Sequence, residues 1–217
     1  VDLYGNAAEA TGTLELDYVA PTVTLLRAPA ALVNQDSATV EFVADEPARF
    51  SCSLDSAPAV PCVSPYAVAD LADGAHLVAI LARDEAGNEA SVSVDFAVDT
   101  SVPETTLDAA PPALSNLESV RFEFSSNDPQ ATFACSLDRA VWDSCVSPLE
   151  LSLAEGDHEL AVRAVDTAGN ADTSPASAAF RLDRTAPVTT FGPIADDGLP
   201  ERLVPFAADD PEASFEC

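Results

Sequence analysis

The sequence predicts an all-β chain of tandem antiparallel β-sandwich repeats, each of about 82 residues. An Asp-x-x-Gly-Asn motif recurs with its aspartates at 2, 84 and 166, so the step is 82 each time (84 − 2 and 166 − 84). A fixed step of this size is the signature of a repeat array. Short segments between turn-forming residues alternate apolar and polar side chains with period two, as half-buried strands do. Together these observations favour about seven short strands per repeat.

The repeat divides the chain into two complete and two partial units. We expect the C-terminal part of one repeat at 1–20, complete repeats at 21–102 and 103–186, and the N-terminal part of a truncated repeat at 187–217. Because both ends fall inside units, the chain is expected to be a fragment of a longer array. Proline restricts itself and its predecessor to extended conformations. We therefore expect short, stiff joins at the three Asp-x-x-x-Pro linkers, at 17–21, 99–103 and 183–187.

Each element has a local reason in the sequence. The opening fragment holds a turn at 2–6 and a strand at about 11–16. Branched or alternating residues predict strands in the first complete unit at 22–27, 38–43, 49–54, 76–82 and 92–98. Prolines at 58, 61 and 65 allow only short or edge strands between them. The second unit repeats this plan, with Val120 and Phe122 at the places of Val40 and Phe42, and with two extra residues in its last hairpin.

The cysteines recur with the repeat. Two pairs are separated by ten residues, Cys52 with Cys62 and Cys135 with Cys145, while Cys217 stands where a third pair would begin. We expect two local disulfides and attribute the fifth, unpaired cysteine to truncation. Paired cysteines indicate an oxidising, extracellular compartment. Zinc is disfavoured, because neither Cys-x2-Cys spacing nor histidine partners occur.

The charge limits the partners. Acidic residues number 37 against 9 basic ones, giving a formal net charge of −28. Binding of nucleic acid or of anionic lipid needs clustered Lys and Arg, so neither is expected. No apolar run approaches the roughly 18 residues of a membrane span. Two interpretations of the acidity stay open: a solvated surface suited to a saline habitat, and the binding of divalent cations.

Five segments carry a resemblance to a known family: 131–138, 145–148, 156–158, 166–170 and 183–187. They resemble bacterial Ig-like repeats of large secreted or surface proteins of the adhesin type. The resemblance implies an Ig-like sandwich, located outside the cell or at its surface, that gives an adhesin stalk or surface filament its reach and stiffness. Its partners would be neighbouring repeats, and no adhesion target can be named. The chain departs from antibody-type domains, because the expected disulfides are local and Trp142 lies between two cysteines.

Two other roles fit the same pattern. One is a spacer or binding module of a large secreted multidomain enzyme. The other is a filament subunit whose partial unit is completed by a neighbour's strands. No nucleophile elbow, metal-binding histidine pair or phosphate loop is present, so the segment itself is not expected to be an enzyme. A catalytic site would also interrupt the repeat.

The Asp-x-x-Gly-Asn motif has two interpretations. As a hairpin turn, it uses Gly and Asn for a positive φ and Asp to cap backbone N–H groups. As a calcium site, the motif would supply ligands together with the incoming linker and the loop between the second and third strands. These three segments lie at the same end of an Ig-like sandwich. Calcium takes 6–8 oxygen ligands, and it would neutralise the clustered acids. The candidate ligands at successive joints are Asp17, Asp45, Glu46, Asp84 and Asn88; Asp99, Asp128, Asp166 and Asn170; and Asp183 with Asp209 and Asp210.

Two histidines are in phase with core residues. His76 and His158 each continue the apolar face of a long strand. We expect both to be buried, neutral and hydrogen-bonded to a nearby backbone group.

Overall fold

The computed structural model describes residues 16–193, 204–210 and 213–216. The predicted turn at 2–6, nearly all of the predicted strand at 11–16, and Cys217 lie outside these residues. Within them the chain forms strands only, so no helix there has the length and hydrophobicity of a membrane span. The all-β prediction is therefore confirmed.

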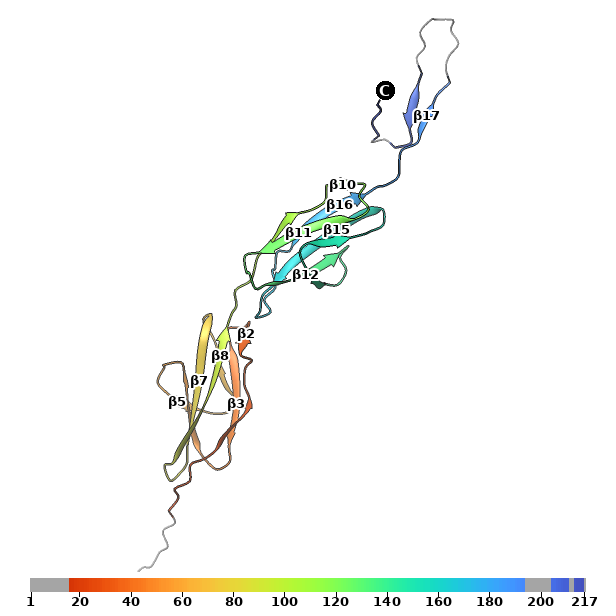
Figure 1. Ribbon diagram of the computed structural model, residues 1–217. Helices are drawn as coiled ribbons and strands as arrows, with labels where there is room; N and C mark the ends of the chain where they lie inside the picture. The colour runs from red at the N-terminus through yellow and green to blue at the C-terminus, as the bar shows by residue number, and fades with distance from the viewer. Residues whose placement is uncertain (1–15, 194–203, 211–212, 217) are drawn as a thin grey trace, which may run out of the picture. The chain divides into compact units, whose positions relative to one another are not determined.

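The first sandwich has a three-stranded sheet in the order β1-β3-β6 and a five-stranded sheet in the order β2-β8-β7-β4-β5 (Figure 1). The pairs are antiparallel, except that β2 runs parallel to β8. The strands are β1 (Val23–Arg27), β2 (Leu32–Val33), β3 (Ala38–Ala44), β4 (Arg49–Leu54), β5 (Val60–Cys62), β6 (Tyr66–Val68), β7 (Gly74–Arg83) and β8 (Glu89–Val98).

The second sandwich repeats this plan. Its three-stranded sheet has the order β14-β11-β9, and its five-stranded sheet has the order β10-β16-β15-β12-β13. The strands are β9 (Thr105–Ala109), β10 (Leu114–Ser115), β11 (Val120–Ser126), β12 (Thr132–Leu137), β13 (Asp143–Cys145), β14 (Leu149–Leu151), β15 (Gly156–Val165) and β16 (Ala176–Leu182). A separate hairpin joins β17 (Thr189–Phe191) to β18 (Phe206–Ala208).

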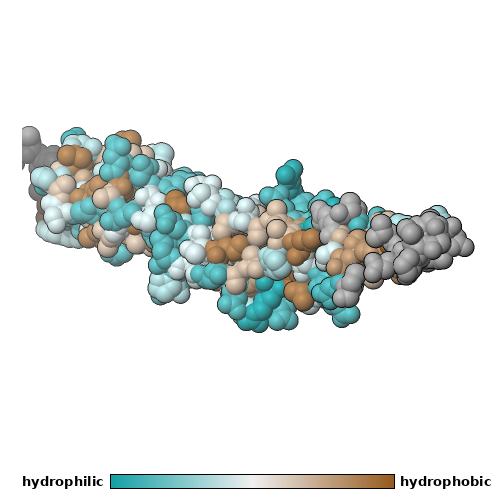
Figure 2. Space-filling model, turned by 90° about the horizontal axis from the view of Figure 1, so that it is seen from above, coloured by the Kyte–Doolittle hydropathy of each residue, from teal (hydrophilic) through white to brown (hydrophobic). Residues whose placement is uncertain are grey.

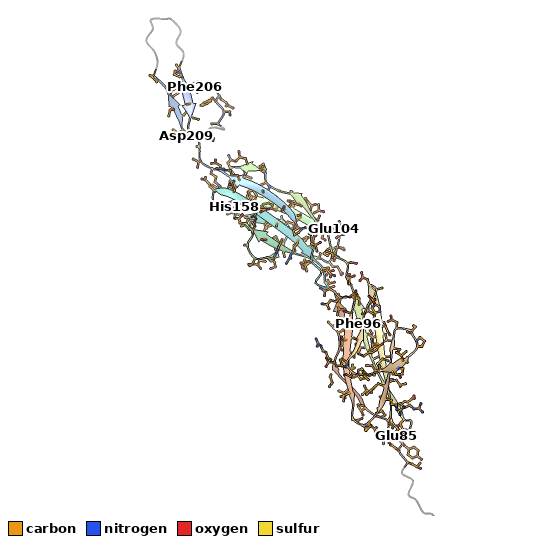
Figure 3. The ribbon with its side chains drawn as sticks, turned by 180° about the vertical axis from the view of Figure 1, so that it is seen from behind. Glu85, Phe96, Glu104, His158, Phe206 and Asp209 are labelled. Atoms are coloured by element: carbon orange, nitrogen blue, oxygen red, sulfur yellow. A yellow bond between two sulfur atoms is a disulfide. The ribbon has the colours of Figure 1, made fainter. Side chains whose placement is uncertain are left out.

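Period-two alternation builds each core. In β11 the side chains of Val120, Phe122 and Phe124 are at most 3% exposed, while the residues between them face outward. Inward-facing residues of both sheets pack into one cluster per sandwich, and Phe96 belongs to the first of them (Figure 3). Removing this apolar surface from water is the main favourable term for folding. Large apolar side chains that stay exposed are dispersed among polar ones on the face in Figure 2.

The structure adds detail to the predicted strands. Each complete sandwich has eight strands, not about seven, because the two-residue strands β2 and β10 are too short to carry a pattern. The proline-rich segment forms only the three-residue strands β5 and β6, and both lie at sheet edges as predicted. The disulfides Cys52–Cys62 and Cys135–Cys145 join β4 to β5 and β12 to β13, also as predicted.

The chain divides into two compact units. One comprises Val1–Pro103 with Val165–Thr173, and the other comprises Glu104–Ala164 with Ser174–Cys217. The turn between β15 and β16 therefore groups with the first unit, where Asn170 hydrogen-bonds to the linker at 99–103. The repeat boundaries inferred from the sequence stay a prediction.

Candidate functional site

The Asp84 turn (residues 84–88) joins β7 to β8, and its aspartate organises it. Asp84 Oδ1 accepts hydrogen bonds from the backbone N–H groups of Gly87 (2.6 Å) and Asn88 (2.8 Å). Asp84 is buried, and burial by itself would raise its pKa. The hydrogen bonds from Asn88 and Gly87 outweigh burial, so the pKa of Asp84 lies below its ordinary value. The predicted capping role is confirmed, and Glu85 lies at the tip of this turn (Figure 3).

The Asp166 turn (residues 166–170) has the same construction. Asp166 Oδ1 accepts a hydrogen bond from the backbone N–H of Asn170 at 2.8 Å. Gly87 and Gly169 have φ of 100° and 93°, in the region that favours glycine, as predicted. Neither asparagine has a positive φ, so that part of the prediction is wrong.

The asparagine side chains instead bind the linker backbone. Asn88 Nδ2 donates to the carbonyl oxygens of Asp17 (3.3 Å) and Val19 (3.1 Å). Asn170 Nδ2 donates to the carbonyl oxygen of Asp99 at 2.8 Å. In both turns the same amide nitrogen also donates to the turn aspartate, at 2.8 Å. The Asn–Asp pair therefore fixes the turn and attaches it to a backbone segment 71 residues earlier in the chain.

Each linker aspartate folds its own segment. The Oδ1 atoms of Asp17, Asp99 and Asp183 accept hydrogen bonds from the backbone N–H two residues later, at 2.9, 3.1 and 3.0 Å. Such side-chain-to-backbone bonds are typical of Asx turns. All three predicted ligands thus have a local structural role.

The loop before β7 binds the linker that leaves the first sandwich. Asp73 Oδ1 accepts from both the backbone N–H and the hydroxyl of Thr100, each at 2.8 Å, and Asp73 Oδ2 accepts from the Ser101 hydroxyl at 2.9 Å. These bonds lower the pKa of Asp73, the backbone N–H of Thr100 contributing most. In the second sandwich Glu155 accepts in the same way from Arg184 N–H (2.9 Å) and the Thr185 hydroxyl (3.2 Å).

Three of the predicted calcium ligands lie together. One carboxylate oxygen from each of Asp17, Glu46 and Asp84 falls within 4.8 Å of the others. Burial, followed by repulsion from Asp17, Asp84 and Asp45, raises the pKa of Glu46. No hydrogen bond or ion pair is found for the Glu46 side chain among the described residues. An all-oxygen donor set of this kind suits a hard cation such as Ca²⁺.

The other predicted ligands have different partners. Asp45 Oδ1 accepts the backbone N–H of Thr22 at 2.7 Å, and Asp209 Oδ1 accepts that of Val188 at 2.7 Å. Asp128 Oδ1 accepts the N–H of Gln130 at 2.8 Å. Among the described residues, no second group of three acidic, histidine or cysteine side chains approaches as closely as the first.

The histidine side chains are largely buried, as predicted, but their surroundings favour the charged ring over the neutral one. Nε2 of His158 lies 3.0 Å from the carbonyl oxygen of Ala154, and Nδ1 lies 2.9 Å from Asp138 Oδ2. Since both neighbours are acceptors, both contacts become hydrogen bonds only when each ring nitrogen carries a proton, so the arrangement favours the charged form of the ring. The hydrogen bond to Asp138, followed by that to Ala154, raises the pKa of His158. His76 repeats this arrangement with Ala72 and Asp55. The expected backbone hydrogen bond is present in both.

Comparisons with known proteins identify the fold. No protein family matches the chain, and no curated protein matches it. Among solved structures, the fibronectin(III)-like modules of Clostridium thermocellum CbhA are 18% identical, with a TM-score of 0.51 over 74% of this chain and 94% of theirs. A 1.5-MDa bacterial ice-binding adhesin is 12% identical, with a TM-score of 0.41 over 83% of this chain and 71% of that one.

A Ca²⁺-stabilised, ice-binding adhesin of an Antarctic bacterium is 17% identical, with a TM-score of 0.42. That match covers 91% of this chain and 59% of the adhesin chain. At these identities the likeness concerns the fold alone. The chain is thus built from β-sandwich repeats of the Ig and fibronectin(III) type, as the resemblance in the sequence implied.

Proposed function

We propose that the chain is a structural repeat segment of an extracellular bacterial adhesin stalk or surface filament, and that it supplies reach and stiffness. Tandem sandwiches, each closed by a local disulfide, suit an oxidising environment outside the cell. A net charge of −28 keeps such an array soluble and opposes association between copies. The partners under this proposal are the neighbouring repeats of the same polypeptide.

The observation that carries the proposal is the hydrogen bonding of the linker at 99–103. Asp73 accepts three hydrogen bonds from Thr100 and Ser101, while the carbonyl of Asp99 accepts one from Asn170. A flexible tether would leave these groups to water. Pro103 further restricts the backbone at the end of the segment. A linker held in this way transmits bending and tension better than a random coil does.

Small-angle X-ray scattering of the whole chain tests this stiffness. Asp73→Ala combined with Asn170→Ala should broaden the distribution of particle dimensions, because the linker loses four hydrogen bonds. Asn116→Ala, an exposed asparagine with no hydrogen bond among the described residues, is the matched control. Equally broad distributions for wild type and double variant would contradict a stiff linker.

We also propose that the Asp17–Glu46–Asp84 cluster binds calcium and so stabilises the linker at 17–21. Glu46 supports this, because a carboxylate beside two others without a compensating charge gains most from a cation. Asn88 already holds the carbonyls of this linker, so the cation would strengthen an existing attachment. The remaining predicted ligands would stabilise their own linkers and loops through hydrogen bonds from backbone N–H groups, as Asp45 does with Thr22.

Calorimetric melting with calcium and with chelator tests this second proposal. Calcium should raise the melting temperature of the wild type, and Glu46→Gln should abolish the increase. Glu85→Gln removes an equal charge from the exposed tip of the Asp84 turn, and it should leave the increase intact. An identical melting temperature in calcium and in chelator would disprove calcium binding without affecting the hydrogen-bonded linker.

A further inference from the structure

Among the differences between the two repeats, three that add a large aromatic or charged side chain fall close together in the second repeat. Alignment on the cysteines pairs residue 142 with residue 59, a step of 83, the same as 135 − 52. Alignment on the histidines pairs 159 with 77 and 163 with 81, a step of 82, the same as 158 − 76. The first repeat holds Ala59, Leu77 and Leu81 at these positions, and the second holds Trp142, Glu159 and Arg163.

The three residues come together on one surface. In β15, Leu160 and Val162 point into the core, so the alternating positions 159, 161 and 163 lie on the outer face of the five-stranded sheet. Trp142 directly precedes β13 at the edge of that sheet. The guanidinium carbon of Arg163 lies 4.4 Å from the centroid of the Trp142 ring.

Arg163 positions this ring. Its Nε atom is buried and finds no hydrogen-bond partner among the described residues. Stacking on Trp142, as a cation–π contact, is therefore the main interaction found for the guanidinium. One face of the tryptophan is covered in this way, while 36% of the residue stays exposed.

A pocket of about 310 Å³ opens beside the ring, lined by Ser136, Arg139, Ala140, Trp142, Glu159 and Ala161. This volume is at the lower end of the range for small-molecule sites. Arg139 Nε lies 3.2 Å from Glu159 Oε2, so the pocket wall presents both a donor and an acceptor. An aromatic surface thus adjoins a polar, charge-balanced edge.

This combination selects a neutral, polyhydroxylated ligand. A sugar ring presents C–H groups on its face, which stack on an aromatic ring, and hydroxyls at its edge, which hydrogen-bond to carboxylate and guanidinium groups. Anionic ligands are repelled by the chain's net charge of −28. Cationic ligands are disfavoured beside the ring, because Arg163 and Arg139 already lie there.

We propose that this pocket is a binding site for a neutral sugar residue of a glycan. Trp142 stacks on the sugar face, and Arg139 and Glu159 bind its hydroxyls. The site gives the second repeat a recognition function that the first repeat lacks, and it does not depend on the stalk role. A shallow open pocket with one aromatic surface implies weak, millimolar affinity.

Intrinsic fluorescence tests the site, since Trp142 is the single tryptophan of the sequence. Titration with cellohexaose, mannohexaose and chitohexaose should give a saturable change for at least one of them. Oligogalacturonate, an anionic glycan, should give none. Glu159→Leu restores the first-repeat residue, keeps the fluorophore, and should weaken binding by about tenfold or more.

Two controls keep the test decisive. Glu118→Leu makes the same substitution at an exposed site elsewhere on the repeat, and it should bind as the wild type does. Circular dichroism establishes that each variant is folded. The proposal is overturned if none of the three neutral glycans gives a saturable change, if Glu159→Leu binds as tightly as the wild type, or if oligogalacturonate binds equally well. Trp142 would then be a cover for the outer sheet face only.

Discussion

Replacing Asn170 by alanine should destabilise the second sandwich more than the loss of a half-buried polar side chain usually does. The substitution removes two hydrogen bonds of 2.8 Å, one to the Asp166 carboxylate and one to the carbonyl of Asp99. A hydrogen bond to a charged group contributes about 1.5–3 kcal/mol, and a neutral one about 0.5–1.5 kcal/mol. Partial exposure reduces both, so we expect a loss of roughly 2–3 kcal/mol in the free energy of unfolding.

For a domain of this size, such a loss lowers the melting temperature by roughly 10–20 °C. The measurement is thermal unfolding of the whole chain followed by Trp142 fluorescence, which reports on the second sandwich alone. Asn116→Ala again serves as the control, because it shortens an exposed asparagine of the same repeat, and it should change the melting temperature little.

A double-mutant cycle sharpens the interpretation. If Asn170 acts through Asp166, then Asp166→Ala combined with Asn170→Ala should destabilise the sandwich by clearly less than the sum of the single substitutions. The reasoning would be refuted if Asn170→Ala unfolded within about 0.5 kcal/mol of the wild type. Strict additivity in the cycle would instead limit the role of Asn170 to the linker.

Two further predictions concern the second sandwich. Replacing Cys135 and Cys145 by alanine should lower its unfolding free energy by roughly 2–3 kcal/mol, because the disulfide closes a short loop. In urea titrations followed by Trp142 fluorescence, a reductant should then shift the midpoint of the wild type but not of this variant. For His158 the folded pKa lies above the ordinary 6.5, so its stabilising effect is full below that pH and is lost as the pH rises through the raised pKa. The stability difference between wild type and His158→Gln should therefore be largest below about pH 6.5 and shrink as the pH rises above it, and a constant difference would contradict a stabilising charge on His158.

Features set by the core could be predicted from the sequence. The alternation of Val120, Phe122 and Phe124 identifies a strand, because a period of two places these side chains on one buried face. The ten-residue cysteine spacing identifies the disulfides, since a segment of this length can bring both ends of a hairpin together. By contrast, β2 and β10 are two residues long and pair in parallel with distant strands, so no local pattern marks them.

The role of the turn asparagine could not be predicted from its neighbours. Gly87 takes the positive φ, so Asn88 is not needed for backbone conformation. Its amide is used for a contact with Asp17, 71 residues away, and only the assembled fold brings these groups together. The Trp142 pocket is a different case, because a residue-by-residue alignment of the two repeats is enough to reveal its three substitutions. What the alignment lacks is the stacking of Arg163 on the ring, which depends on the pairing of distant strands.

The acidic residues near the linkers have two separable roles, as hydrogen-bond acceptors and as charges that a cation can neutralise. A difference between the two repeats distinguishes these roles. Asp45 and Asn127 occupy the same place, and each accepts the backbone N–H that precedes the first strand, at 2.7 and 2.8 Å. Since an uncharged amide serves there as well as a carboxylate, that position requires an acceptor and not a charge. Glu46 is different, because burial and repulsion from its neighbours raise its pKa. A cation would therefore act on the charge of Glu46, while hydrogen bonds hold the linkers whether or not one is bound.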